Sequence, residues 1–325
     1  MKTAVPPKIN YLRLSVIDRC NLRCFYCNYW REGDKLPAPE ILRYEELLRV
    51  ASLAAEMGLR KVRVTGGEPL IRRGVVDFLH KLHQIPGLEE ICLTTNGVLL
   101  PDLAPALYET GLRRLNVSLD TLRRDRYQEI TGRDNFLEVM AGLNRAVSLG
   151  FHPVKINCVV LKSLNDDEIL DLALLARDHP YQVRFIELMP TGSFKDWQRY
   201  FLPMMEVRRL LSVLGTPEPV APEATAGPAR LSRFPGFKGE LGFISPMSGH
   251  QCRTCNRLRL TAAGKLRPCL LKESELDLKG PLRQGAADPF LSHLFQQAVD
   301  LKAGGFPHPL GELPPLHCSM ASIGG

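Results

Sequence analysis

The sequence has no run of about 18 consecutive apolar residues, so it lacks a segment able to cross a membrane as a helix. Its first ten residues contain two prolines and no apolar stretch, so we expect no secretory signal there. Aromatic residues make up only 7% of the chain and are not interleaved with basic residues, which argues against a platform for stacking nucleic-acid bases. These absences predict a cytoplasmic protein that binds neither membrane nor nucleic acid.

Cysteine is present, but not in the pattern of a disulfide framework. The chain has nine cysteines, an odd number, and six of them form two triplets. This grouping predicts a reducing compartment. We assign no function to the other three, Cys92, Cys158 and Cys318, because a thiol in an apolar strand-like run behaves as a small hydrophobe and the last lies in the C-terminal tail.

The first triplet, Cys20, Cys24 and Cys27, has the spacing C-x-x-x-C-x-x-C and follows an apolar run from Leu12 to Ile17. Structural zinc and ordinary four-cysteine iron–sulfur clusters take four protein ligands, so three thiolates leave one metal position open. An open position on a metal favours chemistry. A zinc knuckle completed by a distant His or Cys is the alternative interpretation.

The second triplet, Cys252, Cys255 and Cys269, has the spacing C-x-x-C-x13-C. Alone it is typical of a zinc ribbon that lacks one ligand. Basic residues surround it, at Arg257, Arg259, Lys265 and Arg267. We therefore expect a metal site inside a cationic pocket, and two incomplete cysteine sites favour two clusters, each with a free iron.

Short β-rich runs alternate with longer amphipathic stretches, which is typical of parallel βα units. The expected strands are Tyr11 to Ile17, Lys61 to Thr65, Glu90 to Thr94, Arg114 to Leu119, Val154 to Val160 and Gln182 to Leu188. The expected crossover helices are Tyr44 to Met57, Val75 to His83, Phe136 to Leu149 and Asp166 to Ala176. This pattern predicts an α/β fold, a partial barrel of six βα units open on one side. The Pro- and Ala-rich stretch from Thr216 to Gly227 is typical of a connecting loop, so we predict domains at 1–215 and 216–325.

Residues able to bind a ligand follow the predicted strands, at the end of the barrel where βα barrels bind their ligands. These ends are Thr65 to Pro69, Thr94 to Gly97, Ser118 to Asp120 and Glu187 to Pro190. The pair Gly66-Gly67 permits the close backbone approach needed to bind a zwitterionic amino acid. Arginines at strand positions and a net charge of +7 favour an anionic small ligand.

The first triplet, with its Asp18-Arg19 lead-in and Tyr26, resembles the cysteine motif of the radical S-adenosylmethionine (radical SAM) enzymes. Gly66-Gly67-Glu68-Pro69, beginning 39 residues after Cys27, resembles the second signature of that superfamily. The resemblance implies a TIM-like partial (β/α)6 barrel. It also implies a 4Fe–4S cluster on the three cysteines, whose fourth iron is chelated by S-adenosylmethionine (SAM).

Segments along nearly the whole chain resemble the MoaA family, the GTP 3′,8-cyclases that begin molybdenum cofactor (molybdopterin) biosynthesis. They are Leu12 to Ser15, Val64 to Leu70, Leu93 to Gly97, Asn116 to Asp120, Ile130 to Arg133, Asn165 to Glu168, Arg184 to Met189, Cys255 to Leu260 and Gly324-Gly325. The second triplet with Arg257 and Arg259, and the Gly-Gly end, are the family-specific parts. This resemblance implies that the C-terminal region, 216–325, closes the open side of the barrel and binds GTP and a second 4Fe–4S cluster, which contacts the substrate.

The reaction implied by the resemblance is a radical cyclisation. Reductive cleavage of SAM gives methionine and a 5′-deoxyadenosyl radical that takes the 3′ hydrogen of GTP. The ribose C3′ radical then attacks C8 of guanine, and reduction by one electron from the C-terminal cluster, with uptake of a proton, gives 3′,8-cyclo-7,8-dihydro-GTP. The residues implied to face SAM are Tyr26, Gly67, Ser118 and Met189. Those implied to face GTP are Arg13, Arg63, Thr94, Lys155, Arg257 and Arg259, with Arg184, Gly324 and Gly325 as further candidates. Beyond the clusters and SAM, no catalytic side chain is expected.

The same resemblance implies a reduced electron donor such as flavodoxin or ferredoxin. It also implies a downstream cyclic pyranopterin monophosphate synthase, and it leaves a homodimer open. Three departures from the family pattern stand out: Asn28-Tyr29-Trp30 in place of Met-Pro, Gly74 in place of Asp, and Gln251 in place of an aromatic.

Two other functions are compatible with parts of the sequence. A radical SAM enzyme with an auxiliary cluster acting on a peptide would keep both triplets without needing Arg257-x-Arg259 or Gly324-Gly325. A non-catalytic zinc protein that binds nucleic acid would explain the cysteines and the positive charge, but not the Gly-Gly-Glu-Pro loop.

Overall fold

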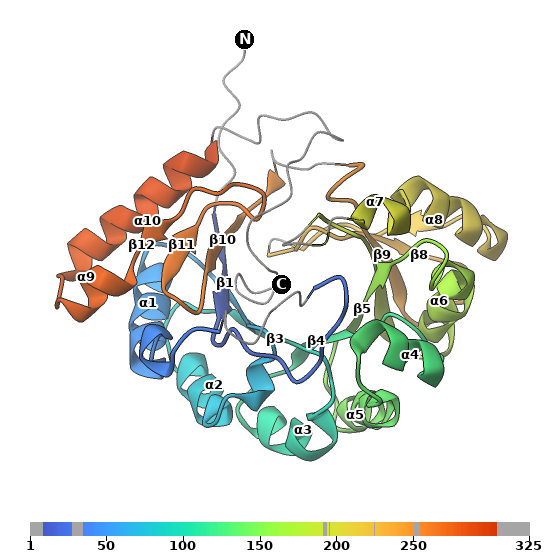
Figure 1. Cartoon of the computed structure of the whole chain (residues 1–325), viewed down its shortest axis with the longest axis horizontal. Coiled ribbons are helices and arrows are strands. Elements are labelled where there is room, and N and C mark those ends of the chain that lie inside the picture. Colours follow the sequence, from blue (N-terminus) through green and yellow to red (C-terminus); the bar gives the residue numbers. More distant parts are fainter. Residues whose placement is uncertain are drawn as a thin grey trace, which may run out of the picture.

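The computed structural model describes residues 9–27, 35–190, 194, 196–223, 225–249 and 254–303. Six parallel strands curve around a central space, with helices on the outside (Figure 1). They are β1 (Tyr11–Ser15), β2 (Lys61–Thr65), β3 (Glu90–Thr95), β4 (Arg114–Ser118), β5 (Val154–Val160) and β6 (Tyr181–Glu187). Each pairs with its neighbour in chain order. The predicted strands and the α/β partial barrel are confirmed, with strand ends shifted by one or two residues.

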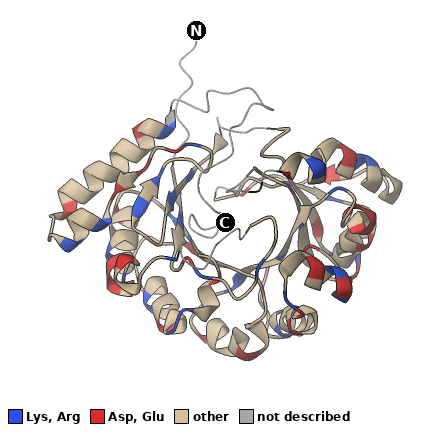
Figure 2. Ribbon diagram, viewed as in Figure 1, with Lys and Arg blue, Asp and Glu red and all other residues tan. Residues whose placement is uncertain are grey.

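The outer helices are α1 (Tyr44–Glu56), α2 (Val75–His83), α3 (Leu100–Glu109), α4 (Arg124–Thr131), α5 (Phe136–Ser148) and α6 (Ile169–Asp178). Short 3-10 turns are η2 (Ala38–Glu40), η3 (Pro69–Ile71), η4 (Asp166–Glu168) and η5 (Ser212–Leu214). The four predicted helices are present, the last as η4 followed by α6. Helices α3 and α4 were not predicted, because α3 contains Pro105 and α4 is mostly polar. Acidic and basic residues both occur along these outer helices (Figure 2).

Alternation along the strands separates the core from the interior of the barrel. In β1, Leu12 and Leu14 are fully buried in the hydrophobic core, whereas Tyr11 and Arg13 line the central cavity. Successive side chains of a strand point to opposite faces, so the apolar set packs beneath the helices and the polar set faces inward. The strands therefore carry an apolar outer face and an unusually polar inner one.

Strands from the C-terminal part of the chain extend the sheet at both edges. On one side, β9 (Glu240–Ile244) lies parallel to β6, followed by β8 (Arg230–Arg233) and β7 (Glu218–Pro219). On the other, β10 (Arg257–Leu260) lies parallel to β1, followed by β11 (Lys265–Arg267) and β12 (Leu276–Asp277). The result is one twelve-stranded sheet. The proposed domain division at residue 216 stays a prediction.

Four further helices belong to this half of the chain: α7 (Trp197–Tyr200), α8 (Met204–Leu211), α9 (Lys279–Arg283) and α10 (Asp288–Ala303). The segment predicted as a connecting loop contains β7 and is tied to the barrel. The Thr225 hydroxyl donates to Glu90 Oε2 (2.6 Å), and Lys61 Nζ donates to the Thr225 carbonyl (3.0 Å). Within the described ranges, no helix has the length and apolar character needed to cross a membrane.

Candidate active site

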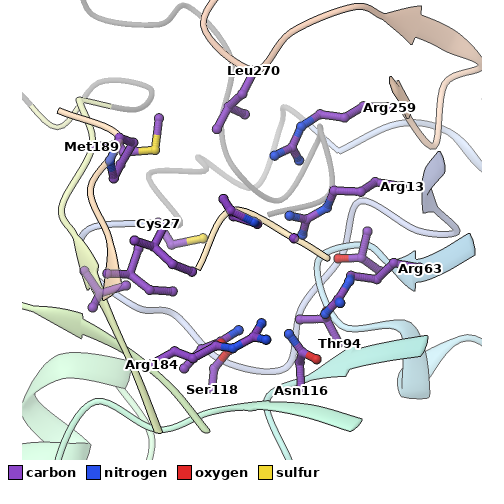
Figure 3. A pocket seen from close by; sticks show the side chains of 18 of the residues that line it. Arg13, Cys27, Arg63, Thr94, Asn116, Ser118, Arg184, Met189, Arg259 and Leu270 are labelled. Atoms are coloured by element: carbon purple, nitrogen blue, oxygen red, sulfur yellow. The ribbon is translucent and has the colours of Figure 1, made fainter. Parts of the chain in front are cut away.

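A cavity of about 380 Å³ lies inside the barrel, within the size range of small-molecule sites. Both cysteine loops contribute to its lining, through Cys20, Cys24 and Cys27 at the C-terminal end of β1 and through Cys255 and Cys269 elsewhere. Cys252 lies outside the described residues. In Figure 3, Arg13, Arg63 and Arg259 follow one side of this cavity, with Cys27 and Met189 on the opposite side.

The first cysteine loop is held by the loop that follows β2. Gly67 N–H donates to the Ile17 carbonyl (2.7 Å), and Glu68 N–H donates to the Arg19 carbonyl (2.8 Å). A Cβ at Gly66 would lie 2.6 Å from the Ile17 oxygen, and one at Gly67 would lie 2.3 Å from the Arg19 oxygen. Both glycines are therefore required by loop packing. Since the Gly67 amide already donates to Ile17, its carbonyl is the group suited to a ligand ammonium.

Glu68 is a buried carboxylate that joins two strand ends. It accepts hydrogen bonds from Leu70 N–H (3.0 Å), the Thr95 hydroxyl (2.8 Å) and Asn96 N–H (2.6 Å). Burial raises the pKa of Glu68 to about 7, against the lowering effect of these donors. The Asn96 side chain then reaches the first cysteine loop, where its Nδ2 lies 3.7 Å from Cys20 Sγ.

The Tyr26 hydroxyl anchors the cysteine loop from the other side by donating to Asp120 Oδ2 (2.5 Å). Asp120 also accepts from Val159 N–H (2.8 Å), and its pKa rises to about 6 because it is buried. Sequence reasoning placed Asp120 at a strand end but gave it no role. Its partner could not be foreseen, because 94 residues separate it from Tyr26.

The first-loop cysteines are half-buried and lie among acidic neighbours. Burial raises the pKa of Cys20 to about 11 and that of Cys24 well above its usual range, with Glu68 adding to the first shift and Asp120 to the second. Within the described ranges, no three His, Cys, Asp or Glu side chains converge as ligands of one metal ion. Thiolates of a 4Fe–4S cluster bind different irons, so three cavity-lining cysteines on one short loop suit a cluster.

The second cysteine loop lies at the opposite end of the barrel. Cys255 precedes β10, which runs parallel to β1, whereas the first cysteines follow β1. Cys269 follows β11, which is antiparallel to β10, so it returns to the same end as Cys255. Burial raises the pKa of Cys255, but Arg257 and Lys302 outweigh it and lower that pKa to about 6.

Two of the cations expected around this loop lie elsewhere. Lys265 pairs with Asp277 (3.2 Å), and Arg267 donates to the Lys272 carbonyl (2.7 Å). Neither residue lines the cavity. The prediction was wrong for this pair, because β11 turns both side chains toward their own acidic or carbonyl partners. The nearby cation that sequence reasoning missed is Lys302, from α10.

Cationic side chains concentrate on the inner face of the strands. Arg13, Arg63, Arg184, Arg257 and Arg259 line the cavity, as does Thr94. The pKa of Arg13 falls well below its usual range, that of Arg184 to about 9 and that of Arg259 to about 10. Burial is the largest cause in each case, followed by repulsion from a neighbouring arginine. An anion bound among these arginines would offset their mutual repulsion.

Lys155 differs from the other predicted GTP contacts because it does not line the cavity. It is buried on β5 beside Arg184 and Arg63. Burial, followed by the charges of these two arginines, lowers the pKa of Lys155 to about 6. The structure thus places it in the same electrostatic cluster as these arginines, although it does not line the cavity.

Family models match most of the chain. One described as the Radical SAM superfamily covers residues 14–176, and one described as Molybdenum Cofactor Synthesis C covers residues 181–306. The chain is 47% identical to the GTP 3′,8-cyclase of Moorella thermoacetica over 100% of both chains. It is 48% identical to that of Pelotomaculum thermopropionicum over 93% of this chain and 94% of that one. The chain belongs to the GTP 3′,8-cyclase family.

Solved structures agree with this placement at the level of fold. Streptococcus suis SuiB bound to S-adenosylmethionine superimposes with a TM-score of 0.58 at 15% identity, over 90% of this chain and 69% of that chain. The enzyme anSMEcpe with bound AdoMet gives a TM-score of 0.51 at 22% identity, over 64% of this chain and 57% of that chain. Membership in the radical SAM superfamily implies SAM and a 4Fe–4S cluster, and it excludes the zinc-protein alternative.

The four residues predicted to contact SAM all lie in the cavity of this cyclase. Tyr26, Gly67, Ser118 and Met189 all line the cavity, near the first cysteine loop or at neighbouring strand ends. Of the family departures, Gly74 precedes α2 with φ of 80°, in the left-handed region that favours glycine over aspartate. Asn28-Tyr29-Trp30, Gln251, Gly324 and Gly325 lie outside the described residues, as does Cys318.

Two asparagines of this cyclase were missed by sequence reasoning. Asn116 on β4 and Asn157 on β5 line the cavity, and the Oδ1 atom of each is buried with no hydrogen-bond partner among the described residues. These oxygens suit hydroxyl or amino donors of a nucleoside. Counting alternate positions along the two strands would have identified them as inward-facing.

Proposed function

We propose that the two ends of this cavity divide the work of a GTP 3′,8-cyclase, with SAM at the first cysteine loop and GTP along the arginines toward the second. The activity, which begins molybdenum cofactor synthesis, is that of the relatives matched over the full length of the chain. The observation that carries the proposal is a single cavity with cysteine loops at opposite ends. Between these ends it is lined by five arginines, which we call the arginine wall: Arg13, Arg63, Arg184, Arg257 and Arg259.

At the first end, Cys20, Cys24 and Cys27 would hold the 4Fe–4S cluster. When bound, this cluster and SAM supply a 5′-deoxyadenosyl radical that takes the 3′ hydrogen of GTP. The protein's contribution is position. Glu68 and Asp120 fix the loops that carry Gly67 and Tyr26. Holding two reactants at contact distance inside the cavity of the partial barrel accelerates their reaction and shields it from solvent.

The arginine wall is the proposed site of the triphosphate, which carries about four negative charges and is well matched by bidentate guanidinium groups. Arg13, Arg63 and Arg259 face it along one side, and Arg184 faces it from β6. Thr94 Oγ1 accepts from Arg63 Nη1 (3.4 Å), which orients that guanidinium. Lys155 would act through the charge of this cluster, and Asn116 and Asn157 would accept from ribose hydroxyls.

Cys252, Gly324 and Gly325 also take part in the proposed function, although they lie outside the described residues. Cys252, Cys255 and Cys269 would hold a second 4Fe–4S cluster that binds guanine, and Gly324-Gly325 would enter the site. The partners are a reduced flavodoxin or ferredoxin and, downstream, cyclic pyranopterin monophosphate synthase. We place this chemistry in the cytoplasm, where thiols stay reduced.

Anaerobic reconstitution tests the proposal. We expect about eight irons per chain, as two 4Fe–4S clusters require. After addition of dithionite and SAM, we expect 5′-deoxyadenosine by mass spectrometry only when GTP is present, together with the cyclised nucleotide. About four irons would discard the second cluster. Deoxyadenosine formed equally without GTP would discard the proposed coupling between the two ends of the cavity.

A further inference from the structure

The last turn of α10 places a lysine directly on the second cysteine loop. Lys302 Nζ donates to Cys255 Sγ (3.2 Å) and to the carbonyl of Pro268 (2.8 Å), the residue before Cys269. One ammonium therefore joins the two segments that carry the described cysteines of this loop. The half-buried side chain also lines the cavity.

The position of this ammonium is set by the core of the protein. Helix α10 buries Leu291, Phe295 and Ala298, and it packs against α1 and β11. At its start, Arg49 Nη2 donates to Asp288 Oδ1 (2.6 Å). At its end, Lys272 Nζ donates to the Leu301 carbonyl (2.8 Å). A helix fixed at both ends presents Lys302 at a defined place.

We propose that Lys302 is a positioning residue of the second cluster and raises its reduction potential. The inference rests on the proposed function, because it assumes that Cys255 ligates a cluster. A 4Fe–4S cluster gains one electron on reduction and becomes more negative by one charge. A cation that hydrogen-bonds a ligand sulfur stabilises the reduced form more than the oxidised form, and such contacts are among the factors that set cluster potentials.

Among the cations that the structure describes near this loop, Lys302 is distinguished by its direct side-chain contact with sulfur. Arg257 and Arg259 lie on β10, and their side chains line the cavity as part of the arginine wall. Lys265 is engaged with Asp277 and lies off the cavity. Lys302 therefore supplies the ligand contact, whereas Arg257 and Arg259 line the cavity.

The test isolates the second cluster and measures its potential. In a background with Cys20, Cys24 and Cys27 replaced by alanine, only the second cluster assembles, and its reduction is followed by electron paramagnetic resonance at controlled potentials. For Lys302→Met we expect the ratio of reduced to oxidised cluster at a fixed potential to fall about tenfold, which is about 59 mV for one electron. Lys302→Arg should restore most of the shift, and Lys302→Gln, a neutral donor, should lie between.

Lys265→Met is the matched control, since it removes one positive charge from the same region without touching a cysteine. Its potential should stay near that of the unsubstituted background. An unchanged potential in Lys302→Met or Lys302→Gln at full iron content would overturn the inference. If Lys302→Met fails to hold iron, Lys302→Gln provides the measurement. A background that binds no iron at all would instead overturn the second cluster of the proposed function, and the inference with it.

Discussion

The two cysteine loops place the same kind of residue in opposite electrostatic surroundings. In the first loop, burial raises the pKa of Cys20 to about 11, and Glu68 and Asp120 lie nearby. In the second, the charges of Arg257 and Lys302 lower the pKa of Cys255 to about 6 against the effect of burial. The cavity is therefore polarised, with carboxylates at one end and cations at the other.

This polarity matches the charges of the two proposed ligands. SAM carries a sulfonium, an amino group and a carboxylate, and its net positive charge suits the end that contains buried carboxylates. GTP carries a triphosphate, which suits the arginine wall. The difference shows how one barrel can hold two nucleoside ligands in a fixed order, because each end disfavours the charge of the other ligand.

The largest expected effects come from removing one ligand cysteine at each end. Cys24→Ser should abolish both cluster binding at the first loop and SAM cleavage, because SAM then lacks its iron. Cys255→Ser should leave SAM binding intact and abolish the cyclised product. Iron content, SAM binding and product formation distinguish the two variants. Cys158→Ala, which removes a buried thiol outside both loops, is the control and should keep product formation; equal loss of SAM binding in both ligand variants would contradict the division of the cavity.

Sequence reasoning identified the barrel because the strands alternate with helices, and it located the cysteine loops and Gly66-Gly67 from spacing. It could not find contacts made by the tertiary fold. Lys302 reaches Cys255 from 47 residues away, on a helix with no motif. Lys155 was predicted to face the ligand, but it is buried and does not line the cavity. The alternation of residues along a strand predicts which face of the sheet a side chain lies on. Tertiary packing determines whether that side chain reaches the cavity.

A second, smaller effect is the loss of folding stability that comes from placing several cations close together at one end of the cavity. The pKa of Lys155 is lowered from 10.5 to about 6 in the folded protein. Between these values the unfolded chain binds more protons than the folded one, so the free energy of unfolding rises with pH. Lys155→Met should therefore stabilise the ligand-free protein at pH 7, and its advantage should shrink by up to about 1.4 kcal/mol per pH unit toward pH 9.

Urea unfolding of the ligand-free protein at pH 7, 8 and 9 measures this advantage. The exposed Lys81 provides the control, and Lys81→Met should show no comparable dependence on pH. A constant difference between Lys155→Met and the unsubstituted protein across the series would mean that Lys155 is charged in the folded state. The cationic end would then be less crowded than its geometry indicates.

The smallest expected effect tests the carboxylate end. Tyr26→Phe removes the hydrogen bond from the Tyr26 hydroxyl to Asp120 but keeps the ring that packs against Phe25. A hydrogen bond to a charged group contributes about 1.5–3 kcal/mol, and part of this is recovered by solvent, so we expect SAM to bind about tenfold more weakly to the reconstituted protein. GTP affinity should stay unchanged, and Tyr44→Phe is the control.

Asp120→Ala sharpens this test, because Asp120 also accepts from Val159 N–H and can act independently of Tyr26. If the two residues act through one hydrogen bond, the double variant should bind SAM about as weakly as Asp120→Ala alone, since alanine has no side-chain acceptor and the second change removes nothing further. Additive losses would instead mean that the Asp120 carboxylate acts on SAM through its charge. In that case the acidic end of the cavity would recognise its ligand directly, as the cationic end is proposed to do.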